Sequence, residues 1–530
     1  GVVYDGTGAP PRSIDLGVEA GRFVLDPGER ASATVIDVAG LAVCPGFVDI
    51  HKHSDLNLLS CPTAPSTIRQ GVTTEVVGNC GLGVAPTGES GVFAAGLAVK
   101  PAEIRSAAGY LDLDPAIAID WTDISGYLDA LRQVGPVPNV ATFVPHGPVR
   151  AGVVGFDDTV STAAQRQRLS GILGEGLDQG AVGLSTGLVY PPARYADDAE
   201  LLALARVVAA KDKVFAWHVR DYADDLLPSV RQAISVALRT GCRTQISHLA
   251  VVGRRNWGKV RVALDEVDSA NERGCDIGVD CYPYLAGNAP LSQLLPAAIQ
   301  DGGEDAMRMR LGDPQMRRSI ESAWSGAAFQ WVDIVISTVP PGADLVDQRM
   351  VGRTITEIAE SLDASAAGVA MDVLQRCGHG VQMVAFGRDE RDLRTVLAHP
   401  RSVVASDGMA IDPDGPTGAA GTPHPRSFGC FPQFLSRYCT DLADGIRRCT
   451  SAPADRVGLH DRGRIADGLP ADLVVFDPST LADKATYQAP QQVPAGIELV
   501  MVGGEVVLRA GHGTAARPGN VLLVGQQGSR

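Results

Sequence analysis

Long apolar runs are missing from this sequence. The chain has 530 residues and 45% of them are apolar, but no uninterrupted apolar stretch approaches the roughly 18 residues that a membrane-spanning helix needs. The first residues also lack the basic and then apolar pattern of a signal peptide. We therefore expect a folded protein with no membrane partner, because the apolar content is too high for a disordered chain.

An excess of positive charge is missing too. The 46 basic and 61 acidic residues give a formal net charge of −15. A surface of this sign repels nucleic-acid phosphates and anionic lipids. The composition therefore argues against nucleic-acid binding, while the oligomeric state stays open.

The cysteines show neither a zinc-finger spacing nor a disulfide framework. The chain has ten of them, none in a CxxC motif, and they are spread thinly along the sequence. This pattern favours a reducing, cytoplasmic location, where most thiols act as small buried side chains.

The two ends of the chain differ from its middle. Residues 1–42 and 460–530 have the pattern of short strands joined by glycine turns, and Gly503-Gly504 separates two β-branched runs as in a hairpin. We expect the two ends to pair in one small β-sandwich domain. Residues 43–459 then form the second unit.

Eight short segments rich in Val and Ile run through the middle, and each has a polar or catalytic-type residue at or near its end. They are 42–53, 73–80, 139–146, 181–188, 214–219, 243–249, 276–284 and 401–408. Segments with helical spacing separate most of them, such as 161–179 and 196–212. This alternation predicts an α/β fold, a (β/α)8 TIM barrel. The long gap at about 286–400 predicts an inserted lid subdomain.

The clearest chemical signal is a set of metal-ligating residues at the predicted strand ends. His51 and His53 close the first strand and, two residues apart, point the same way. Later strand ends carry Cys80, His218, His248 and Asp407. HxH alone is a weak motif, but the same ends of barrel strands meet on one face, where active sites lie. The sequence therefore predicts a metal site at the barrel mouth.

These residues and several longer stretches resemble the amidohydrolase superfamily and, within it, the N-acyl-D-amino acid deacylases (D-aminoacylases). The matching stretches are QGVTTEVVGNCG (70–81), GAVGLSTGLVYPPARYAD (180–197), QISHL (245–249), NWGK (256–259), YPYLAG (282–287), SDG (406–408), HPRSFGCFPQFLSRY (424–438) and ARPGNVL (516–522). The resemblance implies a zinc-dependent hydrolase of non-peptide C–N bonds, which converts an N-acyl-D-amino acid to a D-amino acid and a carboxylate.

The resemblance also implies the roles of the predicted ligands. A tightly bound Zn²⁺ is implied on Cys80, His218 and His248. His51 and His53 form a second, weaker metal position near the same thiolate. Zinc lowers the pKa of bound water to near 7, so that a metal-bound hydroxide attacks the amide. Asp407 is the expected general base, which then delivers the proton to the departing amine.

Substrate contacts are implied for aromatic and cationic residues near the strand ends. They are Tyr190 or Tyr195, Tyr282, Tyr284 and Arg426. A guanidinium such as that of Arg426 can hold a carboxylate through two parallel hydrogen bonds.

One position departs from the family pattern. Ala250 stands where the family typically has a lysine that is expected to contact the substrate carboxylate. Arg254 or Arg255, in the loop that follows, is a candidate to replace it.

Two alternatives therefore stay open. One is a related amidohydrolase whose substrate, another amide or a biosynthetic intermediate, has no free α-carboxylate at the usual position. The segment 181–188 lacks the lysine of cyclic-amide relatives that hold two metals, which argues against that subtype. The other alternative is a non-catalytic barrel relative, although such a chain should have lost its metal ligands.

Overall fold

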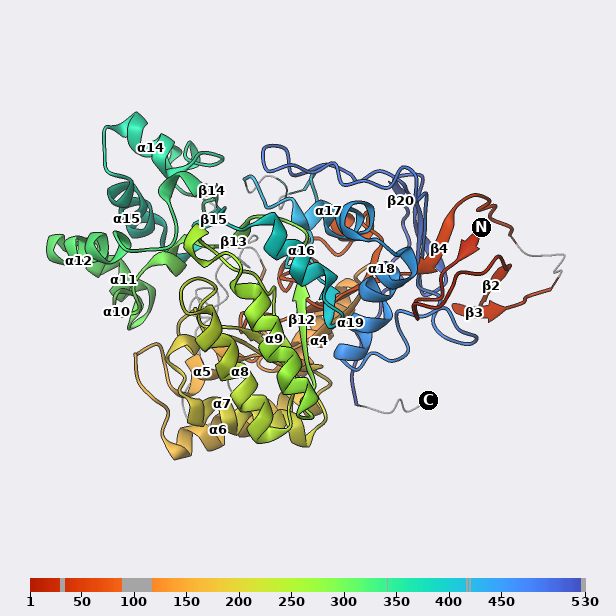
Figure 1. Cartoon of the computed structure of the whole chain (residues 1–530), viewed down its shortest axis with the longest axis horizontal. Coiled ribbons are helices and arrows are strands. Elements are labelled where there is room, and N and C mark those ends of the chain that lie inside the picture. Colours follow the sequence, from red (N-terminus) through yellow and green to blue (C-terminus); the bar gives the residue numbers. More distant parts are fainter. Residues whose placement is uncertain (29–33, 88–116, 341, 416–417, 419–420, 526–530) are drawn as a thin grey trace.

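The computed structural model describes residues 1–28, 34–87, 117–340, 342–415, 418 and 421–525. Figure 1 shows three parts: a central barrel, an insertion that projects from one end of the molecule, and a sheet from both ends of the chain at the other end. The predicted α/β fold with a TIM barrel is confirmed.

Eight strand positions form the barrel. They are β5 (Phe47–Asp49), β6 (Val72–Val77), β7 (Asn139–Thr142) with its continuation β8 (Val144–Pro145), β9 (Gly183–Gly187), β10 (Val214–His218), β11 (Arg243–Ile246), β12 (Ile277–Cys281) and β16 (Ser402–Val404). Neighbouring strands pair in parallel. The ring closes where Lys52 bridges Gly408. Nearly all strand residues are buried, which explains why they appear in the sequence as apolar runs and not as alternating patterns.

Helices and short turns of helix surround the barrel. They are α1 (Asn57–Ser60), α2 (Pro65–Ile68), α4 (Ile124–Val134), α5 (His146–Val153), α6 (Ala163–Asp178), η2 (Ala193–Tyr195), α7 (Asp198–Ala210), α8 (Leu226–Thr240), η3 (Arg254–Asn256), α9 (Lys259–Glu272), α16 (Glu390–Ala398), α17 (Arg426–Gln433), the π-helical turn η7 (Phe434–Tyr438), α18 (Leu442–Cys449) and α19 (Ser451–Arg456). A capping box between Thr162 and Gln165 starts α6, and the Asp197 side chain accepts the Glu200 N–H at the start of α7. None of the helices in the described part of the chain has the length and apolarity to cross a membrane.

The insertion follows β12 and has a hydrophobic core of its own. Its elements are β13 (Gly287–Pro290), η4 (Leu291–Leu294), α10 (Ala297–Gln300), α11 (Gly303–Leu311), α12 (Pro314–Trp324), η5 (Trp331–Asp333), β14 (Ile334–Thr338), α13 (Leu345–Gln348), α14 (Ile355–Leu362), α15 (Ala366–Cys377), η6 (Gly378–Gly380) and β15 (Gln382–Ala385). Leu291, Ile336 and Met371 are among the side chains of its core. The next helix, α16, packs on α9 of the barrel, so the insertion ends before residue 390.

The two ends of the chain share one six-stranded sheet. Its order is β1 (Val2–Val3), β4 (Ala42–Pro45), β17 (Leu473–Phe476), β18 (Ile497–Val502), β19 (Glu505–Arg509) and β20 (His512–Gly513), with the hairpin of β2 (Leu16–Glu19) and β3 (Arg22–Leu25) as a separate sheet. Gly503 and Gly504, both with positive φ, form the expected turn between β18 and β19.

Two passages of the chain differ from the expected division into ends and middle. β4 pairs with β1 and β17, so the chain enters the barrel at Gly46. The sequence shows 42–53 as one apolar run because β4 and β5 are both fully buried. Residues 518–525 leave the terminal sheet, and the Val140 N–H of the barrel donates to the Asn520 carbonyl at 2.9 Å.

Candidate metal centre

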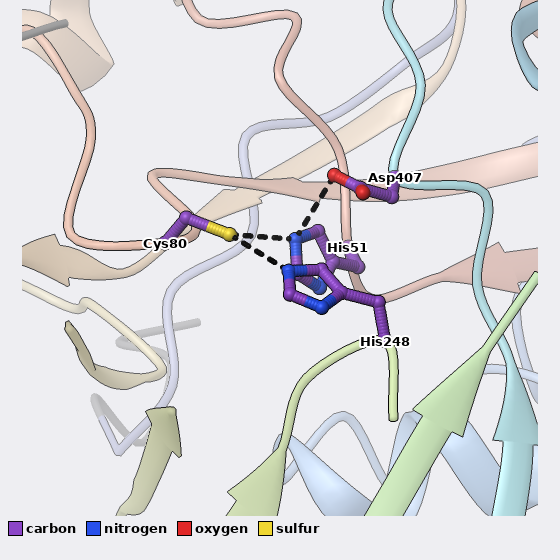
Figure 2. Close-up of side chains that lie close together, drawn as sticks. All are labelled: His51, Cys80, His248 and Asp407. Atoms are coloured by element: carbon purple, nitrogen blue, oxygen red, sulfur yellow. Dashed lines mark hydrogen bonds and ion pairs between the residues drawn. The ribbon is translucent and has the colours of Figure 1, made fainter. Parts of the chain in front are cut away.

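Four ligand side chains meet at the mouth of the barrel. Figure 2 shows His51, Cys80, His248 and Asp407, whose ligand atoms all lie within 4.8 Å of one another. Cys80 Sγ is 3.2 Å from His51 Nε2 and 3.4 Å from His248 Nε2, and His51 Nε2 is 3.4 Å from Asp407 Oδ1. All four side chains are buried. Thiol, imidazole and carboxylate groups in such proximity have the chemistry of a transition-metal site.

The backbone is left-handed at three of these four residues. The φ angle is +55° at Cys80, +35° at His248 and +52° at Asp407, a region that residues other than glycine rarely adopt. Local hydrogen bonds hold this geometry: the Asp407 N–H donates to the His51 carbonyl at 2.9 Å, and the His248 N–H donates to Asp280 Oδ1 at 2.7 Å. Strain of this kind clusters at functional sites, where it aims side chains at a common point.

The two other predicted ligands lie beside this group. His53 Nε2 is 3.0 Å from Asp407 Oδ1. The ring centroid of His218 is 4.6 Å from that of His248, and neither ring nitrogen of His218 has a hydrogen-bond partner among the described residues. A buried imidazole without a partner is costly, so a metal ion fits the needs of this side chain. The compact group of four, called the metal-ligand cluster below, consists of His51, Cys80, His248 and Asp407. His218 lies at the edge of this cluster, next to His248.

Asp407 is held as a carboxylate by its neighbours. Burial disfavours its ionised form, but Arg426, His51 and His248 hold the pKa of this carboxyl well below its usual range. Arg426 Nη1 lies 2.7 Å from Asp407 Oδ2. An ionised carboxylate is the form that can accept a proton.

Cys80, His218 and His53 are buried in their neutral forms, whereas Cys80 and Asp407, against the opposing effect of burial, raise the pKa of His51 well above its usual value. Burial raises the pKa of the Cys80 thiol to about 11, although His51 opposes this shift. Burial also lowers the pKa of His218 to about 3 and that of His53 to about 4. Neutral imidazole is the form that binds metals, and metal binding displaces the proton of a thiol.

Asp280 is a site residue that the sequence reasoning missed. Its Oδ1 accepts the His248 N–H and lies 3.4 Å from His51 Nδ1, and its Oδ2 accepts a hydrogen bond from Gln245 Nε2 at 2.9 Å. A carboxylate in this position orients a ligand imidazole. Its place at the end of β12, the same end at which the other ligands lie, was the available signal.

A cavity of about 330 Å³ opens above the ligands. The barrel contributes Cys80, Tyr190, His218, Tyr222, His248, Tyr282 and Asp407 to its lining, and the insertion contributes Asn288, Leu294, Phe329, Ile334, Met383 and others. The insertion therefore covers the metal-ligand cluster. Tyr222, with its ring centroid 5.0 Å from that of His218, carried no signal in the sequence.

The predicted tyrosines divide into two groups. Tyr190 and Tyr282 line the cavity, whereas the Tyr195 hydroxyl donates to the Ala297 carbonyl at 3.4 Å and the Tyr284 hydroxyl to Asp483 Oδ2 at 2.7 Å. Tyr282 and Tyr284 do not share a side because β12 ends at Cys281 and the chain turns there. The Tyr284 N–H donates to the Tyr282 carbonyl at 2.9 Å in this turn.

The predicted arginines lie away from the cavity lining. Arg426 is bound to Asp407, and the guanidinium of Arg254 lies 5.9 Å from the ring centroid of Trp257. Arg255 is ion-paired with Asp224. The arginine that does line the cavity is Arg388, which lies between β15 and α16.

Comparison with known proteins agrees with this architecture. A profile of the amidohydrolase family matches residues 34–234 and 394–508. An N-acyl-D-glutamate deacylase from Alcaligenes xylosoxydans xylosoxydans is 33% identical over 530 residues, with 98% of this chain and 95% of the relative covered. A D-aminoacylase from the same organism is 31% identical, with 98% and 96% covered.

A solved structure extends the likeness to three dimensions. The N-acyl-D-glutamate deacylase of Bordetella bronchiseptica, in complex with zinc and a phosphonate inhibitor that mimics the tetrahedral intermediate of its reaction, has a TM-score of 0.80 and 32% identity to this chain. The match covers 99% of this chain and 98% of the other. From the metal-ligand cluster, the fold and these full-length matches, the chain belongs to the amidohydrolase family, in its group of N-acyl-D-amino acid deacylases.

Proposed function

We propose that this protein hydrolyses the amide bond of N-acyl-D-amino acids and releases a D-amino acid and a carboxylate. The observation that supports this proposal best is the buried cluster of thiol, imidazole and carboxylate groups at the floor of a ligand-sized cavity. The full-length relatives named for deacylation of D-amino acids agree with it.

Zinc is the metal that this chemistry favours, because a thiolate and imidazoles together select Zn²⁺ over Mg²⁺ or Ca²⁺. We infer that Cys80, His218 and His248 hold a tightly bound ion, and that His51 and His53 provide a weaker position. Bound zinc would polarise the amide carbonyl and lower the pKa of a water molecule.

The side chain of Asp407 is the candidate general base. It lines the cavity, and Arg426 fixes its orientation through the 2.7 Å contact at Oδ2. We infer that the carboxylate takes a proton from the attacking water and gives it to the nitrogen of the departing amine. No nucleophilic side chain is needed for this chemistry.

A hydrolysis screen with zinc analysis on the same sample tests the proposal. N-acetyl-D-amino acids, their L enantiomers and uncharged amides are compared, and we expect turnover of the D compounds with at least one zinc per chain. Hydrolysis only of uncharged amides would favour the related amidohydrolase with another substrate. Absence of both zinc and turnover would favour the non-catalytic alternative, against which the retained ligands argue.

A further inference from the structure

Arg388 brings a cation to the wall of the cavity. It lies between β15 and α16, and its Nη2 donates a hydrogen bond of 2.6 Å to the Tyr282 hydroxyl oxygen. Its guanidinium carbon is 4.7 Å from the ring centroid of Tyr282. The Nε and Nη1 atoms are buried and have no hydrogen-bond partner among the described residues. Buried guanidinium donors without an acceptor are costly, so this side chain is prepared for an anionic ligand.

A second arginine, Arg426, also packs on the ring of Tyr282, but its charge is paired with a carboxylate. The guanidinium carbon of Arg426 is also 4.7 Å from the ring centroid of Tyr282, but its Nη1 contacts Asp407 at 2.7 Å. The charge of Arg426 is therefore balanced within the protein. Histidines apart, Arg388 is the only cationic residue among the described residues that line the cavity.

The backbone before Arg388 is attached to the loop that follows β11. The Gly387 carbonyl accepts hydrogen bonds from the Gly253 N–H at 3.1 Å and from Trp257 Nε1 at 3.0 Å. This loop contains His248 and Ala250. Arg388 therefore lies beside the segment in which Ala250 stands in place of the lysine that is typical of the family.

Tyr282 can add a second hydrogen bond to a ligand. Its oxygen accepts from Arg388, which leaves its O–H proton for another acceptor. Burial raises the pKa of Tyr282, although Arg388 and Arg426 oppose this, so the hydroxyl is protonated near pH 7. A guanidinium and a phenol side by side match the two oxygens of one carboxylate.

The rest of the lining is largely apolar. It includes Val189, Val252, Leu294, Ala328, Phe329, Ile334, Met383, Ala385 and Phe386. Its other charged groups are carboxylates, which repel a second anion. The described lining thus has a cationic group for one substrate carboxylate and an apolar surface for a side chain.

We propose that Arg388, with the Tyr282 hydroxyl, binds the α-carboxylate of the substrate and that the substrate carries no second carboxylate. This inference rests on the proposed hydrolysis of N-acyl-D-amino acids and names the residue that selects their charge. Arg388 replaces the cation missing at Ala250.

The test compares two ligands that differ in one charge. The kcat/KM of zinc-loaded wild type and Arg388→Met is measured with N-acetyl-D-leucine and with its uncharged amide, N-acetyl-D-leucinamide. We expect Arg388→Met to lose about 100-fold on the acid and less than about 3-fold on the amide, with unchanged zinc content. Arg388→Lys should recover part of the loss. An equal loss on both ligands, or no loss, would overturn the proposal.

Two further variants test whether Arg388, and not another arginine, causes the preference for the acid over the amide. Arg391→Met removes a surface arginine from the same segment, whose side chain is 86% exposed, and should retain the wild-type preference for the acid. If Arg254→Met, and not Arg388→Met, removes that preference, the assignment to Arg388 is wrong.

Two measurements separate this inference from the proposed function. Calorimetric binding of N-acetyl-D-leucine to the wild type and to Arg388→Met tests the arginine even if the wild type hydrolyses no N-acyl-D-amino acid. Equal binding, or none to either protein, would overturn it. N-acetyl-D-glutamate should be a poorer substrate than N-acetyl-D-leucine, and the reverse order would contradict the single-carboxylate assignment.

Discussion

The barrel contains two buried clusters of polar side chains, one around His146 and one at the metal centre. The protein satisfies the imidazole in the first and, within the described part of the chain, leaves an imidazole without a partner in the second. In one, His146 Nδ1 lies 2.9 Å from Thr186 Oγ1 and its Nε2 lies 2.9 Å from Glu200 Oε1. Arg150 Nε donates to the same carboxylate oxygen at 3.1 Å. In the other, His218 has no hydrogen-bond partner for either nitrogen among the described residues, and it lines the same cavity as Cys80 and Asp407.

The difference separates structural from ligand-binding histidines. Both clusters are fully buried, so burial alone does not distinguish them. What distinguishes them is whether the protein itself satisfies both ring nitrogens. His146 is satisfied and stabilises the fold, whereas His218 needs an additional partner such as a metal ion.

The largest expected effect comes from removing the thiol of the metal-ligand cluster. Cys80→Ala should lose tightly bound zinc and lower turnover by about 10³-fold or more, because the metal supplies the activated water and polarises the carbonyl. Metal analysis and kinetics on one sample measure this. Cys242→Ala, at a cysteine that is also buried but lies beside the start of β11, should retain zinc. If Cys80→Ala retained its full content of tightly bound zinc, the proposed difference between the two clusters would be wrong.

A smaller loss is expected when the base is removed but the metal ligands stay. Asp407→Asn should retain the zinc that we infer on Cys80, His218 and His248 and lower kcat by about 10²- to 10³-fold, within the range that general base catalysis contributes. Near-normal kcat with bound zinc would remove Asp407 from its proposed role.

The cluster of His146, Arg150 and Glu200 should show the reverse pattern, in which stability is lost and zinc is retained. Glu200→Gln leaves His146 and Arg150 without their carboxylate, and breaking a buried ion pair costs about 3–5 kcal/mol of unfolding free energy. Urea denaturation measures this loss, while zinc content should equal that of the wild type. Loss of zinc without loss of stability would show that the two clusters are not separate.

The smallest expected effect is a pH dependence of the stability that the cluster of His146, Arg150 and Glu200 provides. His146 and Arg150, against the opposing effect of burial, lower the pKa of Glu200 to about 2. A carboxyl whose pKa is lowered by folding stabilises the protein above its unfolded pKa of about 4.5 and loses this contribution as the pH falls through about 2. The stability difference between wild type and Glu200→Gln should therefore shrink between pH 4.5 and pH 2. A difference that stays constant over this range would contradict the lowered pKa.

The sequence predicted the barrel and the neighbourhood of its ligands because both follow from a local, repeated pattern. Each strand is a short apolar run, and its last residues lie at the barrel mouth whatever the loops do. This places His51, Cys80, His248 and Asp407 on one face. It does not specify contacts that depend on how distant segments pack.

The residues that the sequence did not reveal depend on that packing. Arg388 reaches the cavity only because the segment after the insertion is hydrogen-bonded to the loop after β11. Tyr284 and Arg426 leave the cavity because a turn and an ion pair direct their side chains elsewhere. A change of one residue in where a strand ends reverses the side on which a residue points.

The pairing of β4 has a consequence for the order in which the protein matures. β4 leads through Gly46 to β5 and His51, and its residue Val43 pairs with Val475 of β17. During synthesis the first part of the chain leaves the ribosome long before β17 does. β4 therefore gains its β17 partner only after the barrel strands from β5 to β16 have been synthesised. The pairing that anchors the segment leading to His51 consequently forms only after every predicted ligand, from His51 to Asp407, has been synthesised.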